Sequence, residues 1–351
     1  MFHSFTDAGV LLAIREPNVI IGPIAKLLGS VYNVLFQFIY GITTNGSLAI
    51  AIILFTILVK FILFPLMIKQ QKSSFKLQQL QPEMNKIRAK YKDKKDQLSQ
   101  QKMYVELQDF QKANGINMLG GCLPLLIQLP ILYALFYIFQ QAYLYVDVIA
   151  QNYSDIANIL NAAPEAVRLE VFQPYLEFWQ SLEPALDGFT KAGYDANTIQ
   201  NFALIDSFKA SDWSYVMNTL GENAKNLPQL LQQKDDIEMF FSISLINNAG
   251  LGFPGIFIPI FAAVTTWVQA KIMQQLTTNT TSPDDPAAAM TNSMSKTMLY
   301  FMPVMMGVMT INVPAALGLY WIVSNLISII QQILLKKHFK KKFEKEALQN
   351  G

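Results

Sequence analysis

Long apolar segments separated by polar connections dominate the pattern of this chain. A membrane-spanning helix needs about 20 predominantly apolar residues. Five segments meet or approach that length: 47–68, 118–141, 253–271, 297–312 and 315–335. The last two form one stretch that is too long for a single helix, and we expect it to turn back at the Asn-Val-Pro sequence 312–314. The pattern predicts an all-α, polytopic membrane protein with five core transmembrane helices.

The charges of the connections predict the orientation of these helices. Residues 69–117 hold eleven Lys or Arg against five acidic residues, and the tail 336–351 holds six Lys against two acidic residues. Residues 142–252 hold five basic against fourteen acidic residues. Because connections rich in Lys and Arg stay in the cytoplasm, we expect 69–117 and the tail inside and 142–252 outside.

The N-terminal part of the chain leaves two alternatives open. Residues 18–44 are apolar but are interrupted by Gly22, Pro23 and Lys26. They fit a further span or an amphipathic helix on the membrane surface, and we favour the surface helix, which makes the N-terminal segment extracytoplasmic. The chain is thus predicted to have five parts. They are this N-terminal segment (1–46), the first two core helices with their hairpin (47–141), an insertion (142–252), core helices three to five (253–335) and a basic tail (336–351).

The connection 69–117 predicts a cytoplasmic helical hairpin. It is rich in helix-forming Gln, Lys, Leu and Met, the polar run 92–96 interrupts it, and Gly115 follows as a stop signal. Apolar residues at spacings of three and four predict the packed faces of the two limbs. They are Phe75, Leu77, Leu80, Met84, Ile87 and Tyr91 in the first limb and Met103, Leu107 and Phe110 in the second.

The connection 142–252 is long enough to form a small helical insertion outside the membrane. Helical patterns occur at 164–182 and at 223–240, the second interrupted by Pro228. No functional site is recognisable in it, so we expect an accessory domain or cap.

Lys60 is the most informative residue. Apart from Lys271 at the end of its segment, it is the only charged residue in the five apolar segments. A cation at bilayer depth costs about 2.5–3.5 kcal/mol on insertion scales, so it needs water, protein or an anionic partner. Snorkelling to the interface is the alternative, but residues 61–68 span ~12 Å of helix, and a lysine stem covers only part of that. We therefore expect Lys60 in a wet cavity.

Further polar residues in the apolar segments fall on shared helix faces. Trp321, Asn325, Ser328 and Gln332 follow the i, i+4, i+7 and i+11 pattern of one face. Hydrogen bonds between helices explain such a face as well as a cavity does, and an interfacial belt position explains Trp321 equally well. Thr56 lies one turn before Lys60, and Thr265 shares a face with Gln269. The residues predicted to line a hydrophilic, cationic cavity are Lys60, Thr56, Gln128, Gln269, Trp321 and Asn325.

The residue inventory argues against covalent chemistry. His3 and His338 lie at opposite ends of the chain, Cys122 is the only cysteine, and no Ser/His/Asp set is recognisable. We therefore expect no enzyme, no metal and no cofactor. An ion-coupled transporter or channel is the second candidate, but coupling usually needs intramembrane Asp, Glu or His, and the apolar segments hold none.

Three motifs stand out in the apolar segments: GGCLPLLIQLP at 120–130, FMPVMM with LGLYWIVSNLISIIQQ at 301–332, and LFTILVKFILFPL at 54–66. Together they resemble motifs of the YidC-type membrane protein insertases, the family shared with the mitochondrial oxidase-assembly and thylakoid albino proteins. NMLGGCLPLLIQLP at 117–130 resembles the signature that opens the second core helix of that family. FMPVMM at 301–306, followed by LGLYWIVSNLISIIQQ at 317–332, resembles its fourth and fifth core helices, and LFTILVKFILFPL at 54–66 resembles its first. The resemblance covers 44–141 and 252–337 and fails in the insertion, which is longer than the usual family loop.

The resemblance implies an insertase and chaperone without covalent chemistry. Its five core helices would enclose a groove open to the cytoplasm and to lipid, where a basic residue attracts acidic parts of a nascent chain. That residue falls on Lys60, where the family usually has Arg. The groove Thr, Gln and aromatic residue fall on Thr56, Gln269 and Trp321.

The resemblance also implies partners and a location. We expect nascent membrane proteins, membrane lipid and the ribosome as partners, with the protein acting alone or beside the Sec translocon, and no role for DNA. The location implied is a bacterial cytoplasmic membrane with the C-terminus inside. The basic tail 336–351 fits ribosomal RNA or anionic lipid, or it only sets the topology.

Overall fold

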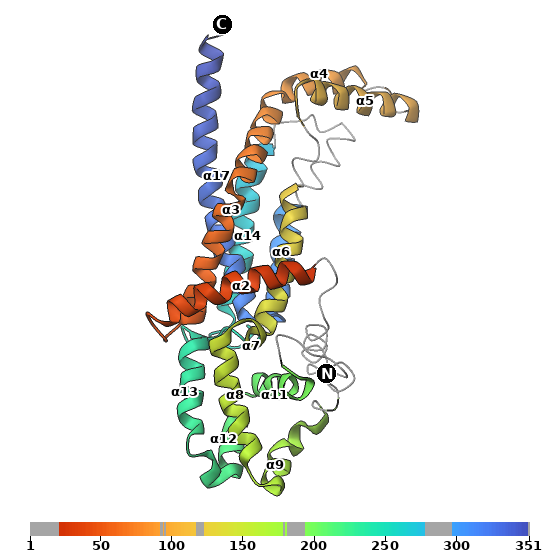
Figure 1. Cartoon of the computed structure of the whole chain (residues 1–351). Coiled ribbons are helices and arrows are strands. Elements are labelled where there is room, and N and C mark those ends of the chain that lie inside the picture. Colours follow the sequence, from red (N-terminus) through yellow and green to blue (C-terminus); the bar gives the residue numbers. More distant parts are fainter. Residues whose placement is uncertain are drawn as a thin grey trace. The chain divides into compact units, whose positions relative to one another are not determined.

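A computed structural model describes residues 21–91, 94, 96–116, 123–177, 180, 194–277 and 297–349 (Figure 1). The chain forms two compact units. Unit 1 holds 1–55, 130–259 and 308–320, and unit 2 holds 56–129, 260–307 and 321–351. Residues 117–122, which carry the predicted Gly-Gly-Cys motif, and the connection 278–296 lie outside the described residues.

Two long helices supply much of unit 2. α3 (Ser47–Gln79) and α17 (Ala315–Gln349) both continue past the apolar segments that predicted them. Gln, Lys and Leu favour helix, so the polar flanks extend the helices instead of ending them. On these extensions Phe75 packs with Leu335 and Phe339. The placement of Phe75 in the hairpin was therefore wrong, and the tail 336–351 continues α17 as far as Gln349.

Two shorter helices of unit 2 form a hairpin. α4 (Gln81–Lys90) packs against α5 (Gln97–Ala113) around Met84, Met103 and Leu107, with Leu77, Ile87, Tyr91 and Phe110 at the edges. The Asp96 side chain caps α5 by accepting from the Ser99 backbone N–H at 2.9 Å. Glu106 accepts from Lys90 Nζ (2.9 Å) and Tyr91 Oη (2.7 Å), and these hydrogen bonds lower the pKa of the Glu106 carboxyl. The first limb is shorter than expected because α3 runs on to Gln79.

Further apolar helices contribute to both units. They are α6 (Leu123–Gln140), α14 (Phe257–Thr277) and α16 (Met302–Ile311), and a π-helical turn, η4 (Thr297–Phe301), precedes α16. The predicted turn at 312–314 is confirmed, since α16 ends at Ile311 and α17 begins at Ala315. In the described part of the chain, two helices are long and apolar enough to cross a membrane, Ser47–Gln79 and Ala315–Lys341. The five-helix membrane core stays a prediction.

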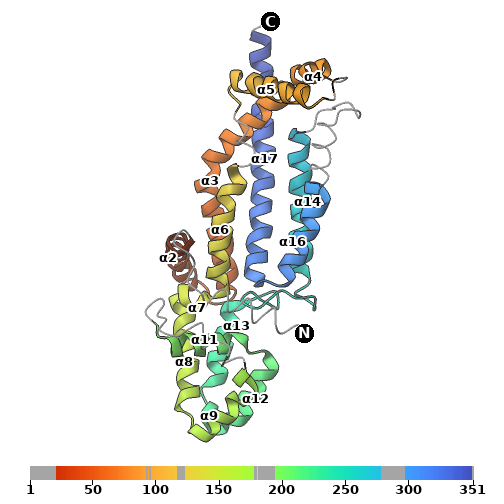
Figure 2. The ribbon, with the colours of Figure 1, turned by 90° about the vertical axis from the view of Figure 1, so that its right-hand side faces the viewer.

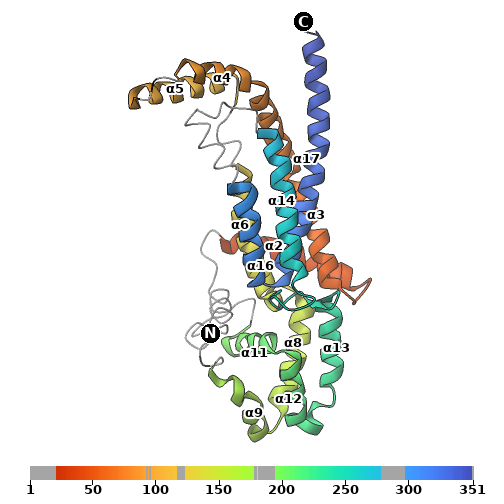
Figure 3. The same ribbon diagram turned by 180° about the vertical axis from the view of Figure 1, so that it is seen from behind.

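Helices make up most of the described insertion in unit 1 (Figure 3). They are α7 (Ala142–Tyr145), α8 (Asp147–Ala162), α9 (Glu165–Phe172), η2 (Gln173–Tyr175), α11 (Ala196–Ser207), α12 (Ala210–Leu220), η3 (Gly221–Ala224) and α13 (Leu227–Glu238). α8 packs against α7, α11 and α13, and α9 packs against α12. Pro228 was expected to interrupt a helix, but it lies in the first turn of α13, where a missing backbone N–H costs nothing.

α2 (Ile21–Tyr40) packs against the insertion and is apolar on two sides. Its inner side is buried, and Tyr32 lies edge-on to Phe55 and Phe139 with ring centroids 5.5 and 5.7 Å away. Its outer side exposes Leu27, Val34 and Phe38, as a helix on a membrane surface would.

The predicted all-α fold is confirmed in the described residues, apart from one small antiparallel hairpin. β1 (Met239–Phe240) pairs with β2 (Ile243–Ser244), with Met239 opposite Ser244. The chain after β2 then hydrogen-bonds to the turn between α16 and α17, where Ala315 N donates to Asn247 O at 2.9 Å. Strands this short carry no periodic signal, so helix-directed reasoning could not find them.

Candidate functional site

Lys60 lies on the part of α3 that belongs to unit 2, half-buried against α17. Its Nζ donates to Ser328 Oγ at 2.9 Å. Within the described residues, the ion pairs are Lys90–Glu106 and Lys234–Glu238, so Lys60 is held there by a neutral hydroxyl group. Thr56, one turn earlier on α3, is fully buried. The charge expected from the sequence is therefore held in place without an ion pair to any of the described residues.

A second polar group joins α17 to α14. Trp321 Nε1 donates to Thr266 Oγ1 at 3.0 Å. The Asn325 amide is best satisfied with its nitrogen donating to Gln269 Oε1 at 2.6 Å, because its oxygen then accepts from Thr265 Oγ1 at 3.1 Å and Thr266 Oγ1 at 2.9 Å. The structure thus brings together three predicted residues, Gln269, Trp321 and Asn325. Thr266, which touches two of them, was missed because nothing in the sequence separates it from Thr265.

The polar face of α17 continues along the helix beyond Ser328. Gln331 and Gln332 are buried, as is Gln71 on α3. In the part of the chain that the structure describes, Gln331 Oε1, Gln332 Oε1 and Gln71 Nε2 have no hydrogen-bond partner. A buried amide group without a partner is unfavourable by a few kcal/mol, typically ~1–3. Such groups indicate a place where water or another polar chain completes the hydrogen bonding.

The outer sides of the same helices are apolar. Phe61 and Ile62 on α3 and Ile330 and Leu334 on α17 are exposed, while the polar residues described above point inward. Figure 2 shows α14 and α17 running beside each other, as their hydrogen bonds require. A polar interior with an apolar exterior is the reverse of a soluble domain and fits helices that face lipid.

Two of the predicted residues, Thr56 and Gln128, take no part in the hydrogen bonds described above. Gln128 is the one that lies on another helix. It lies half-buried on α6 in the same unit. Cys122 lies outside the described residues. Among the described residues, no group of three or more His, Cys, Asp or Glu could hold a metal ion. The site therefore consists of one cation, hydroxyl groups, amides and an indole, a set suited to binding.

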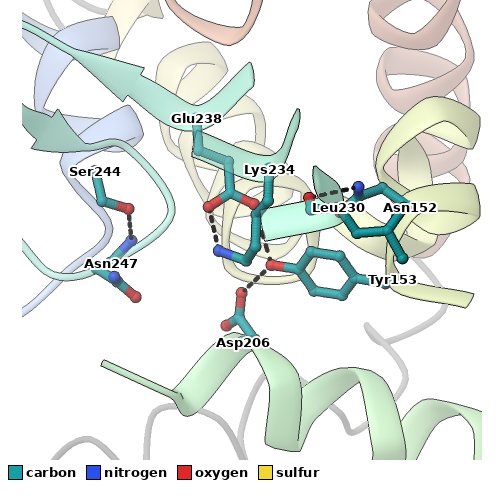
Figure 4. Close-up of polar contacts among 8 residues, drawn as sticks. All are labelled: Asn152, Tyr153, Asp206, Leu230, Lys234, Glu238, Ser244 and Asn247. Atoms are coloured by element: carbon teal, nitrogen blue, oxygen red, sulfur yellow. Dashed lines mark hydrogen bonds and ion pairs between the residues drawn. The ribbon is translucent and has the colours of Figure 1, made fainter. Parts of the chain in front are cut away.

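A separate charged cluster is buried in the insertion, joining α8, α11 and α13 (Figure 4). Lys234 and Glu238 form an ion pair within α13. Tyr153 Oη of α8 donates to Asp206 Oδ1 of α11 at 3.0 Å and lies 3.2 Å from Glu238 Oε1. Burial raises the pKa of the Asp206 carboxyl to about 7, with Glu238 adding to the effect and Lys234 opposing it. The sequence did not indicate this cluster, because its members come from three helices.

Comparison with known proteins identifies the family. The 60Kd inner membrane protein family model matches residues 38–342. The chain is 28% identical over 292 residues to membrane protein insertase YidC 2 of Bacillus anthracis, covering 83% of this chain and 73% of the relative. It is 29% identical over 293 residues to membrane protein insertase MisCA of Bacillus subtilis, covering 84% and 72%. It is 26% identical over 312 residues to membrane protein insertase YidC of Fusobacterium nucleatum, covering 88% and 97%.

The family match spans most of the chain and includes α3, α14 and α17, which carry the polar site. The resemblance inferred from three short motifs is therefore confirmed, but its expected failure in the insertion is wrong, because the family match extends through 142–251. The chain is a member of the 60Kd inner membrane protein family, to which the YidC-type membrane protein insertases belong.

Proposed function

We propose that the protein is a membrane protein insertase that binds the hydrophilic part of a nascent chain at Lys60 and releases the apolar part into lipid. It is a multi-pass protein of a bacterial cytoplasmic membrane, and it acts as a binding protein and chaperone without covalent chemistry. The polar groups of α3, α14 and α17 line a groove that opens to the cytoplasm and to lipid.

The observation that carries this proposal is that Lys60 forms no ion pair with any of the described residues. A structural lysine inside a protein is normally paired with a carboxylate. Lys60 instead donates to Ser328 Oγ, so its positive charge can attract an acidic segment of another chain. A hydroxyl group is also easily replaced as an acceptor, which allows the substrate carboxylate to take its place and leave again.

The unpaired amides near the ends of the apolar segments support the same proposal. Gln71, Gln331 and Gln332 are buried, and each has a polar atom without a partner in the described residues. An unfolded substrate brings backbone N–H and C=O groups that need partners in a low-dielectric environment. These amides would supply them on the cytoplasmic side of Lys60, where the substrate enters.

The apolar outer sides of the helices provide the exit. A substrate segment that leaves the polar groups of α14 and α17 meets lipid next to exposed residues such as Val264 and Ile330. Transfer of an apolar side chain into lipid contributes ~0.8 kcal/mol per buried methylene group. Binding of the polar part is transient and burial of the apolar part is lasting, so insertion needs no chemical energy at this site.

The positive connections suggest the remaining partners. We place the α4–α5 hairpin and the basic end of α17 in the cytoplasm, following the distribution of Lys and Arg. There they are suited to the ribosome, whose RNA is anionic, and to anionic lipid headgroups. The protein acts on its own or beside the Sec translocon.

Site-specific photocrosslinking tests the proposal. A crosslinking amino acid is placed at Gln269, Trp321 or Asn325, so that Lys60 keeps its charge, and a ribosome-bound nascent chain with a short acidic N-terminal tail is presented to the protein in vesicles. Phe61, which is exposed on the same helix, is the matched control position. We expect adducts at the three polar positions, weak adducts at Phe61, and loss of the polar adducts when the tail is made basic.

Two outcomes would reject the proposal. Adducts that do not depend on the charge of the tail would remove the electrostatic role of Lys60. Absence of adducts together with ion flux through the same vesicles would favour a transporter or channel.

A further inference from the structure

The segment that joins the insertion to α14 is unusually apolar and carries no charge. From Met239 to Ile256 it contains no Asp, Glu, Lys, Arg or His. It holds β1 and β2 and then runs to Phe257, where α14 begins. We call residues 239–256 the aromatic ledge. Its composition contrasts with the acidic remainder of the insertion.

Within unit 1, the ledge is hydrogen-bonded to the ends of the apolar helices. Just before it, Asp236 O accepts from Gly46 N at 2.7 Å, immediately before α3 begins. Leu245 O accepts from Ala316 N at 2.8 Å in the first turn of α17, and Gly250 N donates to Ile311 O at 3.1 Å at the end of α16. Figure 2 shows the two short strands (teal arrows) next to the ends where α16 finishes and α17 begins. The ledge therefore lies at the level where the apolar helices end.

Two phenylalanine side chains project from the ledge. Phe241 is 82% exposed and Phe253 is 85% exposed. Among the described residues, the aromatic neighbour of Phe241 is Phe240, with 4.6 Å between ring centroids, and that of Phe253 is Phe257, at 5.7 Å. Single exposed apolar residues need no explanation, but two aromatic rings on an uncharged segment at the end of membrane-crossing helices do.

The backbone at the tip of the hairpin adds an independent observation. Phe241 and Ser242 have positive φ angles of 48° and 62°. Two-residue hairpin turns of this kind normally use Asn-Gly or Asp-Gly, because a bulky side chain disfavours positive φ. This turn instead holds a phenylalanine whose ring is turned outward. A strained backbone conformation that keeps an apolar ring exposed indicates that the ring contacts something other than this chain.

We propose that the aromatic ledge inserts Phe241 and Phe253 into the headgroup and upper acyl region of the outer leaflet. Aromatic rings are enriched at this depth of a bilayer. The ledge offers no charge to a protein partner. It leads directly into α14 and is hydrogen-bonded to the first turn of α17, and the proposed function places both helices in the membrane. The ledge would hold the base of the insertion against the lipid surface and fix the level of the α16–α17 turn.

Depth-dependent fluorescence quenching tests the ledge. Cys122→Ser removes the only cysteine, and single cysteines at Phe241, Phe253, Phe61 or Glu222 are labelled with an environment-sensitive dye. The full chain is reconstituted in phosphatidylcholine–phosphatidylglycerol vesicles that carry bromine near the top of the acyl chains. Phe61 reports lipid contact of α3, and Glu222, exposed on η3 of the insertion, reports water.

We expect the dyes at 241 and 253 to be quenched by bromine several-fold more than the dye at 222 and to be shielded from aqueous iodide. Water-like signals at 241 and 253, with strong bromine quenching at 61, would contradict the proposal that the ledge inserts into lipid. The proposed function would then be unaffected. Shielding from iodide without bromine quenching would also contradict insertion of the ledge into lipid, because a protein contact would then cover the rings. A water-like signal at 61 would instead reject the membrane topology on which both proposals rest.

Discussion

The protein contains two lysines that are withdrawn from water in different ways. Lys234 in the insertion pairs with Glu238 on the same helix, and its ammonium group lies 5.6 Å from the centre of the Tyr153 ring. Lys60 donates to Ser328 Oγ and forms no ion pair with any described residue. The charge of Lys234 is balanced by a carboxylate of the same chain, whereas the charge of Lys60 can still pair with a carboxylate of another chain.

This difference separates a structural charge from a binding charge. A buried ion pair adds little net stability, but loss of one partner leaves an uncompensated charge and is strongly destabilising. A cation supported by a hydroxyl group instead remains attractive to any carboxylate that approaches. The two lysines should therefore respond to substitution in opposite ways: Lys60 through activity and Lys234 through stability.

The largest effect is expected from Lys60→Glu. The reversed charge repels acidic substrate segments, so insertion of an acidic-tailed substrate into proteoliposomes should fall more than tenfold, equivalent to ~1.4 kcal/mol or more. Lys60→Arg keeps the charge and should keep the activity. Equal insertion by both variants at equal protein levels would remove the electrostatic role.

Substitution of the paired lysine should instead act on folding. Lys234→Met leaves Glu238 buried without its cation and should lower the free energy of unfolding of the insertion by ~3–5 kcal/mol. Thermal unfolding followed by the fluorescence of the buried Trp213 measures this. The double variant Lys234→Met/Glu238→Leu removes both charges and should recover most of the loss. A single variant as stable as the parent would contradict the pairing.

The same cluster makes the stability of the insertion depend on pH. Burial raises the pKa of Asp206 to about 7 in the folded protein, above its usual value near 4. Between these values the folded state holds a proton that the unfolded state releases, so the free energy of unfolding falls as the pH rises from about 4 to about 7. The slope for one proton is at most about 1.4 kcal/mol per pH unit.

Asp206→Asn tests this dependence because the amide cannot titrate. The groups that face or influence Asp206 are Tyr143, Tyr153, Lys234 and Glu238, and all of them stay in the variant. Unfolding midpoints from pH 4 to pH 8 should change less in the variant than in the parent. The same slope in both proteins would assign the effect to Glu238, whose pKa burial also raises.

A smaller effect is expected from Asn325→Leu. The substitution removes the hydrogen bonds that Asn325 of α17 makes with α14, including the one to Gln269 Oε1, and leaves the Trp321–Thr266 hydrogen bond in place. Loss of such a bond costs ~1–3 kcal/mol, and insertion should fall less than with Lys60→Glu because the cation stays in place. Thr265→Val is the milder control, since Thr266 still reaches Asn325. A complete loss of insertion in Asn325→Leu, with normal folding, would make Asn325 rather than Lys60 the principal residue.

Periodicity anticipated part of this arrangement. Residues spaced by three and four share a helix face, so the inward face of α17 with Trp321, Asn325 and Ser328 could be found in the sequence. The turn at 312–314 followed from the length of the apolar stretch and its proline. The absence of charge around Lys60 was also visible without a structure.

The remainder depended on contacts between elements far apart in the chain. Thr266 and Gln71 carry no distinguishing local signal. Thr266 joins the site through its hydrogen bond with Trp321 of α17, and Gln71 is recognised only by its burial on α3. Phe75 was assigned to the hairpin because its spacing fitted the apolar face of the first limb. In the structure it belongs to α3, where its ring packs against Phe339 of α17. The Lys234 cluster and the hairpin β1–β2 arise from tertiary packing, for which local patterns give no rule.

A charge exchange between the protein and its substrate tests the central claim most directly. Lys60→Glu and the parent are each presented with two substrates that differ only in an acidic or a basic N-terminal tail, and insertion is measured in the same vesicles. The account predicts that the parent prefers the acidic tail and that Lys60→Glu prefers the basic tail, so that a second charge reversal restores insertion. Loss of insertion for both tails in a normally folded Lys60→Glu protein would contradict direct attraction at this residue.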